Sequence, residues 1–397
     1  MDTHRMACSA QALAWLQDLV AHNTISGSQS NLQLLDRIEA FLRELGFSVR
    51  RTYSPDRARA NLFATLGGTG QGGLLLSGHT DVVPVQGQRW TRPPFELFDD
   101  GLRLFGRGTC DMKGFLAAVL AVVGRLGPAR MALPLHLAFT YDEEIGCVGV
   151  RDLLADLARE GIRPAACIVG EPTRMQVVRA HKGRHAWRCR VQGRAAHSSL
   201  SGTGVNAAEV ACELVSEITG QARRLRQTAT DDGFYVPYST LATCRVHAGH
   251  AGNVIPEEAE FDFDLRYLPG TDPERTIAPI LARARDLSRA MQDMDPDTAV
   301  VMARRSAVPA LAHDPGTETF VQHLLRAGAP LGAHVAYTTE GGLYQAQGIP
   351  TVVCGPGDIA QAHTADEYIL KSQLGACESF LETLLTRPVP DSGASRR

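Results

Sequence analysis

The segment Leu74–Pro84, LLLSGHTDVVP, joins a short apolar run to a histidine and an aspartate. The leucines at 74–76 are typical of a buried strand, and His79 lies just past its end. Open α/β sheets bind their ligands at the carboxyl ends of strands. A histidine at such an end serves as a metal ligand, as a proton carrier or as an ordinary hydrogen-bonded residue. The segment therefore predicts a strand and raises the question of what its histidine does.

Similar patterns recur on both sides of this segment. The apolar runs at 133–140, 165–170 and 349–355 read as further buried strands, and the patterns at 32–45 and 114–127 read as helices. Strands that alternate with helices favour an α/β domain with a mixed, mostly parallel sheet and flanking helices. We expect this domain to comprise residues 1–175 and 305–397.

The middle of the chain reads differently. Strand-like alternation at 184–193, 239–249 and 259–270 is interrupted by helical patterns at 204–219 and 273–291. The order strand, helix, two strands, helix, strand is typical of a small ferredoxin-like α+β sandwich with an antiparallel sheet. We therefore predict that residues 176–304 form a domain inserted into the first.

Composition limits the class of protein. The 397 residues are 44% hydrophobic and 21% charged, with a formal net charge of −3, which gives no sign of nucleic-acid binding. No apolar run is long enough to span a bilayer, and the first residues do not resemble a signal peptide. Nine scattered cysteines without a Cys-x-x-Cys pair favour a reducing compartment. We expect a cytoplasmic enzyme.

Acidic and imidazole side chains follow each predicted strand of the first domain. They are His79, Asp81, Asp111, Glu143, Glu144, Glu171 and His363. Each alone has an ordinary interpretation as a helix cap, a turn residue or a solvated charge. Carboxylates gathered at one edge of a sheet would repel each other, however, and two imidazoles with three carboxylates suit a pair of zinc-like ions. Asp81 is placed to accept the other ring N–H of a liganding imidazole.

Eight motifs in order resemble those of the dinuclear zinc amidohydrolase and peptidase family of the M20 type. They are SGHTDVVPV, GRGTCDMKGF, DEEIGCVG, GEPT, RAHKG, GRAAHSS, GNVIP and AHTADE. This family contains acetylornithine deacetylase, succinyl-diaminopimelate desuccinylase, aminoacylase and carboxypeptidase G2. The segments RAHKG, TEGGLYQAQGIPTVVCGPG and QAHTADEY look most like acetylornithine deacetylase. The resemblance extends from about Ala10 to Leu385 and implies a zinc exopeptidase-like catalytic domain with an inserted dimerisation domain.

The resemblance also implies a role for each residue at the strand ends. His79 and Glu171 would hold one metal ion, Glu144 and His363 the other, and Asp111 would bridge them, followed by a cis peptide bond to Met112. Glu143 would be the general base, a choice between Glu143 and Glu144 that the chemistry alone leaves open. The metals would be Zn²⁺, with Co²⁺ or Mn²⁺ as alternatives.

The remaining motifs imply substrate contacts and an assembly. His197 would reach the active site of a partner subunit in a homodimer and stabilise the oxyanion. Asn253 and Arg266 would hold the carboxylate of the substrate, and Gly341 and Gly342 would line the pocket. His181 has no assigned role.

The reaction implied by the resemblance is the hydrolysis of an N-acyl-L-amino acid, with N2-acetyl-L-ornithine as the substrate in arginine biosynthesis. Another N-acyl amino acid, a dipeptide or succinyl-diaminopimelate is the alternative substrate. A non-catalytic relative is a further alternative, which the loss of a ligand or of the base would have favoured.

Overall fold

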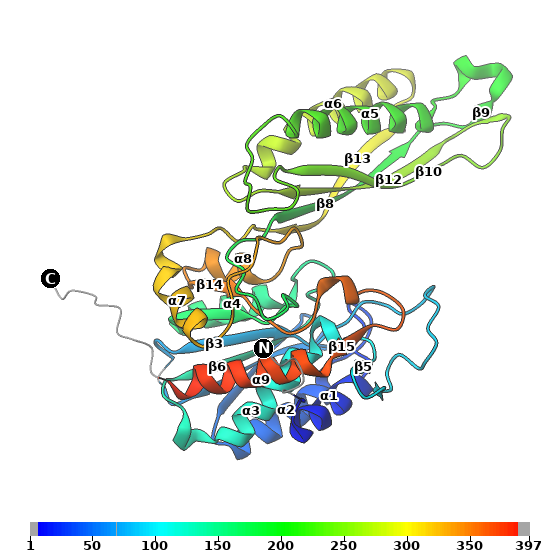
Figure 1. Cartoon of the computed structure of the whole chain (residues 1–397). Coiled ribbons are helices and arrows are strands. Elements are labelled where there is room, and N and C mark those ends of the chain that lie inside the picture. The colour runs from blue at the N-terminus through cyan, green and yellow to red at the C-terminus, as the bar shows by residue number, and fades with distance from the viewer. Residues whose placement is uncertain (1–6, 69, 388–397) are drawn as a thin grey trace. The chain divides into compact units, whose positions relative to one another are not determined.

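The computed structural model describes residues 7–68 and 70–387, which divide into two compact units (Figure 1). The described residues up to Ala180, together with Leu311–Ala333 and those from Thr339 on, form unit 1. Unit 2 comprises His181–Ala310 and His334–Thr338. The chain thus changes units five residues after the expected boundary at 175 and six residues after the one at 304, and it returns to unit 2 once more at His334.

Unit 1 contains a six-stranded mixed sheet. Its strands, in spatial order, are β1 (Ser48–Tyr53), β2 (Ala60–Leu66), β6 (Leu135–Thr140), β3 (Leu74–His79), β7 (Ala166–Val169) and β14 (Thr351–Val353). The last four are parallel to one another, whereas β1 and β2 are antiparallel additions at one edge. Every residue of β3, β6, β7 and β14 is buried, as expected for parallel strands covered on both faces. The predicted mixed, mostly parallel sheet is confirmed.

Helices cover both faces of this sheet (Figure 1). The apolar α3 (Gly114–Leu126) is buried along its length between α1 (Ala10–Ala21) and α9 (Lys371–Thr386), and α2 (Leu32–Glu44) lies in the same core. On the other face lie α4 (Gly149–Arg159) and α8 (Gly341–Ala346), and α7 (Glu318–Arg326) completes the unit. In the ranges 7–68 and 70–387, no helix has the length and apolar character that a bilayer crossing requires.

A small three-stranded sheet, which the sequence did not predict, joins two distant segments of unit 1. It pairs β15 (Tyr368–Leu370) with β5 (Arg103–Phe105), and β5 with β4 (Phe98–Asp99). Because β5 precedes Asp111 and β15 follows His363, this pairing places the two loops side by side.

Unit 2 is a βαββαβ sandwich. Its antiparallel sheet has the order β10 (Thr240–Ala248), β12 (Glu258–Tyr267), β8 (Gly183–Gln192) and β13 (Ala299–Val308). The helices α5 (Ala207–Leu225) and α6 (Pro273–Met294) bury one face, and the short ribbon of β9 (Ala196–His197) and β11 (Val254–Ile255) lies apart from it.

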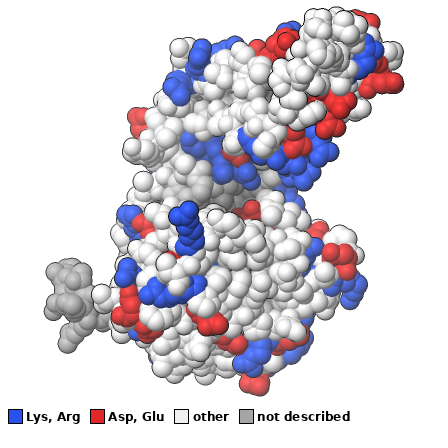
Figure 2. All heavy atoms as spheres, turned by 90° about the vertical axis from the view of Figure 1, so that its right-hand side faces the viewer, with Lys and Arg blue, Asp and Glu red and all other residues white. Residues whose placement is uncertain are grey.

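The opposite face of the unit 2 sheet carries paired charges. Alternate residues of β8 and β12 form the ion pairs Arg184–Asp264, Arg188–Asp262 and Arg190–Glu260. Basic and acidic side chains accordingly lie next to each other on this unit (Figure 2). The two charges of each cross-strand pair neutralise each other, so this face carries both basic and acidic side chains and is not a purely basic surface.

We expect Gly170→Ala to destabilise unit 1. The added methyl group would overlap the ring of Phe115 on α3, and overpacking of this kind costs about 1–3 kcal/mol. The midpoint of urea unfolding should be lower than in the wild-type chain, and adding Phe115→Leu should restore part of this loss. Gly220→Ala on α5 is the control, because the nearest atom to its added methyl group would be Arg224 Nη1 at 3.8 Å, and the variant should be neutral or stabilising. Equal losses in the single and double variants would contradict this packing.

Candidate functional site

The predicted site residues of unit 1 lie at the carboxyl ends of its parallel strands. His79 is the last residue of β3, Glu143 and Glu144 follow β6, and Glu171 follows β7. The register pairs His79 with Thr140 of β6, so the strands end at one level. Parallel strands that end together bring their following residues to one edge, as the sequence predicted.

His79 is buried and faces two carboxylates. Its Nδ1 lies 2.9 Å from the backbone oxygen of Asp81, which fixes the ring proton on Nδ1. Its Nε2 lies 3.0 Å from Asp111 Oδ1 and 3.7 Å from Glu171 Oε1. A ring nitrogen without a proton would repel these oxygens, so a positive charge must lie between them. This geometry fits a metal ion with nitrogen and carboxylate ligands.

A second imidazole approaches the same aspartate from the opposite side. His363 Nε2 lies 3.2 Å from Asp111 Oδ2 and 3.0 Å from Glu144 Oε1. The two oxygens of Asp111 therefore each face a different histidine. Asp111 lies in the turn Thr109–Lys113, and the peptide bond to Met112 is cis, which confirms that expectation.

The cluster has an excess of buried negative charge. Burial raises the pKa of Glu143 and Glu171 well above the usual range and that of Glu144 to about 7. Hydrogen bonds with Asp111 and Glu144 raise the pKa of His363 to about 10. Each shift favours the form that reduces the negative charge, and a bound cation would serve the same purpose. In the described part of the chain, the groups of side chains close enough to hold an ion all include His79, with Glu143 and Glu171 or with Asp111 and Glu144.

Asp81 differs from the sequence prediction in how it acts. Its carboxylate was expected to accept the second ring N–H of His79, but the closest oxygen lies 3.6 Å from Nδ1, and the backbone oxygen takes that bond instead. The carboxylate accepts hydrogen bonds from the backbone N–H groups of Glu143 and Glu144, at 3.1 and 3.3 Å, and from Ser26 Oγ at 2.6 Å. Asp81 thus fixes the Glu143–Glu144 pair as well as His79.

The predicted residues of unit 2 do not all come together. His197 and Asn253 are exposed neighbours in the β9–β11 ribbon, where Ser198 N–H donates to the backbone oxygen of Asn253. Arg266 lies near the far end of β12, bonded to Asp264 and to Thr338 Oγ1. Because strands rise about 3.3 Å per residue, the stretch from Glu258 to Arg266 spans roughly 26 Å. Asn253 and Arg266 of one chain therefore lie too far apart to hold the same carboxylate together.

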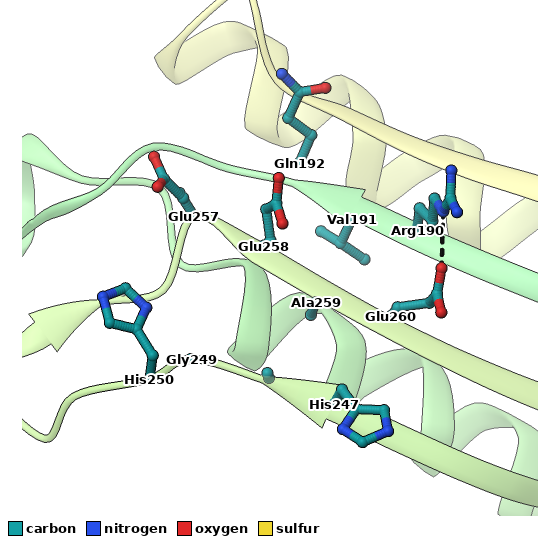
Figure 3. Close-up of a pocket in the computed structure, with 11 residues that line it drawn as sticks. Arg190, Val191, Gln192, His247, Gly249, His250, Glu257, Glu258, Ala259 and Glu260 are labelled. Carbon is teal, nitrogen blue, oxygen red and sulfur yellow. Dashed lines mark hydrogen bonds and ion pairs between the residues drawn. The ribbon is translucent and has the colours of Figure 1, made fainter.

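A pocket of about 670 Å³ lies on unit 2 but contains none of the predicted residues. It is formed by the ends of β8, β10 and β12, with His247, His250 and Glu257 among its lining (Figure 3). The pocket is open and polar, whereas the His79 cluster is buried. The chemistry of the donor atoms, rather than the size of the hollow, identifies the candidate site.

Two buried charged groups near the site, Glu340 and Lys113, were not singled out from the sequence. Burial raises the pKa of Glu340, just before the buried Gly341 and Gly342, to about 7, and Ser77 Oγ lies 3.3 Å from its Oε2. Lys113 is buried, and its Nζ donates to two backbone oxygens at the end of α1. His181, which the sequence left without an assigned role, belongs to unit 2; it is buried with Nδ1 against the Lys182 oxygen, and burial lowers its pKa to about 4. The sequence signal that could have identified Glu340 and Lys113 is a charged residue inside an apolar or glycine-rich motif.

Comparisons with known proteins agree with this arrangement. A model of the peptidase family M20/M25/M40 matches residues 75–387. The chain is 36% identical over 366 residues to an acetylornithine deacetylase of Proteus mirabilis, and the alignment covers 89% of this chain and 90% of the relative.

Solved structures show the same fold. An M20 metallo-carboxypeptidase of Sulfolobus solfataricus has a TM-score of 0.78 at 18% identity, covering 95% of this chain and 99% of that one. A dinuclear metal-binding M20 peptidase of Bacillus subtilis has a TM-score of 0.61 at 16% identity, covering 94% and 96%. The chain therefore belongs to the M20/M25/M40 peptidase family and is a hydrolase of amide bonds.

Proposed function

We propose that this hydrolase removes the acyl group of an N-acyl-L-amino acid, and that its substrate is N2-acetyl-L-ornithine. The products are L-ornithine and acetate, in a cytoplasmic step of arginine biosynthesis. The observation that carries the reaction class is the cluster of the buried His79 and the half-exposed His363 with carboxylates that follow the strand ends. The choice of substrate is supported by the 36% identity to the acetylornithine deacetylase.

The proposed site holds two divalent cations. His79 and Glu171 bind one, Glu144 and His363 bind the other, and Asp111, whose two oxygens face the two histidines, binds both. Nitrogen and carboxylate donors suit Zn²⁺, and Co²⁺ or Mn²⁺ are alternatives. When bound, the pair of ions supplies Lewis acidity for the acyl carbonyl and lowers the pKa of a nearby water.

Glu143 is the proposed general base. Its carboxylate lies within 4.8 Å of the donor atoms of His79 and Glu171, and it is buried. It takes a proton from the attacking water while the water oxygen bonds to the acyl carbon. When the C–N bond breaks, Glu143 returns the proton to the leaving amine nitrogen. Acetic acid and a neutral amine result, and transfer of the acid proton to the amine gives acetate and the ammonium form of ornithine, so atoms and charge balance.

Unit 2 supplies the remaining groups of the proposed site, partly from a second copy of the chain. The separation of Asn253 and Arg266 within one chain supports this assignment, because one carboxylate cannot bind both unless they come from different chains. His197 and Asn253, neighbours in the ribbon, would reach the partner's active site, with His197 stabilising the oxyanion. Arg266 suits the substrate carboxylate, which a guanidinium binds through two hydrogen bonds. We propose a homodimer through unit 2, whose strand β10 lies at one edge of the sheet.

The proposed substrate is tested by comparing acetyl, formyl and succinyl derivatives of several amino acids. We expect kcat/KM to be highest for N2-acetyl-L-ornithine and activity to disappear on dialysis against a chelator. Zn²⁺ or Co²⁺ should restore it. A higher kcat/KM for succinyl-diaminopimelate would show that acetylornithine is not the preferred substrate, while the proposed metal-dependent hydrolysis would stand.

The division of work between the two adjacent glutamates is tested by Glu143→Gln and Glu144→Gln. Glu143→Gln should keep both metal ions but lower kcat by about 10²–10⁴-fold, because an amide does not accept the water proton. Glu144→Gln should lose metal together with activity. Metal content and turnover are measured on the same samples. Metal loss in Glu143→Gln with retention in Glu144→Gln would reverse the two roles.

Action of His197 on the partner's active site is tested by mixing two inactive variants, Glu143→Gln and His197→Ala. After subunit exchange, a mixed dimer would contain one site with both an intact base and an intact histidine. An equimolar mixture should regain about a quarter of the wild-type activity, because random pairing makes half of the dimers mixed. No recovery, with exchange verified by native mass spectrometry, would place His197 in its own subunit's site.

A further inference from the structure

A buried ion pair lies beside the proposed metal ligands without being one of them. Arg107 Nη1 and Glu367 Oε2 are 2.8 Å apart, and each side chain is only 1% exposed. Burying two charges is costly and is tolerated only where their remaining hydrogen-bonding groups are satisfied. The partners of this pair therefore show which part of the structure it stabilises.

Glu367 binds the backbone of the loop that ends at Asp111. Its Oε2 also accepts the N–H of Gly108 at 3.0 Å, and its Oε1 accepts those of Cys110 at 2.9 Å and Asp111 at 3.1 Å. Several backbone N–H groups that converge on one anion form a rigid concave site. The carboxylate thus fixes the backbone from which the Asp111 side chain reaches both histidines.

Arg107 extends the same network to the loop that carries His363. Its Nη2 donates to Gln88 Oε1, and Gln88 Nε2 donates to the backbone oxygen of His363 at 2.7 Å. His363 has a positive φ of 60°, a conformation that a non-glycine residue keeps only when its surroundings hold it. Gln88, Arg107 and Glu367, which we call the loop clamp, therefore hold the backbones of Asp111 and His363.

The other ligands are held differently. His79 belongs to the buried strand β3 and is oriented by the Asp81 oxygen, and Glu171 follows the buried strand β7. Within residues 7–68 and 70–387, no hydrogen bond joins His79 or Glu171 to a residue of the loop clamp. Strand ends therefore hold the proposed ligands His79 and Glu171, whereas Asp111 and His363 lie on loops whose backbones depend on the loop clamp.

We propose that the loop clamp is a positioning device that sets the affinity of the Glu144–His363 metal subsite, with much less effect on the His79–Glu171 subsite. This inference rests on the proposed metal ligands. Residues that orient metal ligands typically change affinity by about 10–100-fold when mutated. The effect should be concentrated in the second subsite because Asp111 and His363 together supply two of its three ligands.

The test uses Glu367→Gln and the milder Gln88→Ala, which removes the bond to His363 from a partly exposed position. Full-length protein is stripped by chelator and titrated with Zn²⁺ against a competing chelator, and with Co²⁺ followed by its visible absorption. The second equivalent should bind about 10–100-fold more weakly in both variants, with the first nearly unchanged.

Glu378→Gln is the matched control. Glu378 is also a buried carboxylate, 4% exposed, and it accepts hydrogen bonds from Ser9 and Arg125 away from the metal ligands. It should lower the melting temperature of the metal-free protein, as Glu367→Gln should, without changing either metal affinity.

The outcomes separate the two proposals. If the wild-type chain binds two equivalents and Gln88→Ala and Glu367→Gln bind both with wild-type affinity, the loop clamp is refuted while the dinuclear site stands. Equal weakening of both equivalents, or the same selective loss in Glu378→Gln, also refutes it. A wild-type chain that binds a single equivalent overturns the dinuclear site and the clamp together.

Discussion

The structure of unit 1 depends on the concentration of negative charge at the ends of its parallel strands. The carboxylates of Asp111, Glu143, Glu144 and Glu171 lie largely out of contact with water and approach two imidazoles, the buried His79 and the half-exposed His363. Unpaired carboxylates are expensive to bury, so the arrangement is stable only with protons or cations among them. The negative charge that makes these carboxylates costly to bury also attracts divalent metal ions. Because the carboxylates repel one another, the surrounding structure must be rigid enough to keep them together.

That rigidity comes from two sources. Strand ends fix His79 and Glu171, because β3 and β7 are buried on both faces and hydrogen-bonded on both sides. Asp111 and His363 lie on loops, whose backbones are not held by hydrogen bonds between paired strands. The pairing of β5 with β15 brings these loops together, and the buried Arg107–Glu367 pair then connects their backbones. Buried charge therefore has two roles in unit 1. The carboxylates at the strand ends are the proposed metal ligands, and the Arg107–Glu367 pair positions the loops that carry Asp111 and His363.

Unit 2 presents the opposite situation, with its predicted functional residues spread over the length of the sheet. His197 and Asn253 share the β9–β11 ribbon, whereas Arg266 lies near the other end of β12. A rigid strand cannot fold back to bring its ends together, so one chain does not gather these groups into one site. In the proposed homodimer, the ribbon of each chain would serve the site of the other chain, so a single chain would not need to gather these groups.

The sequence by itself determined the class of the fold and the candidate metal ligands. Buried strands followed by His79, Glu143 and Glu171 were recognisable because apolar runs and the polar residues after them are local features. The order of patterns at 184–304 likewise predicted the βαββαβ sandwich of unit 2.

Only the tertiary structure decided which polar groups support the ligands. The carboxylate of Asp81 binds the amides of Glu143 and Glu144, Glu367 binds the Asp111 loop, and Asn253 lies far from Arg266 along β12. These relations join residues up to 260 positions apart, as in the Arg107–Glu367 pair. Hydrogen bonds of this kind depend on short distances and on direction, which periodicity along a sequence does not encode, so they appear only when the chain is folded.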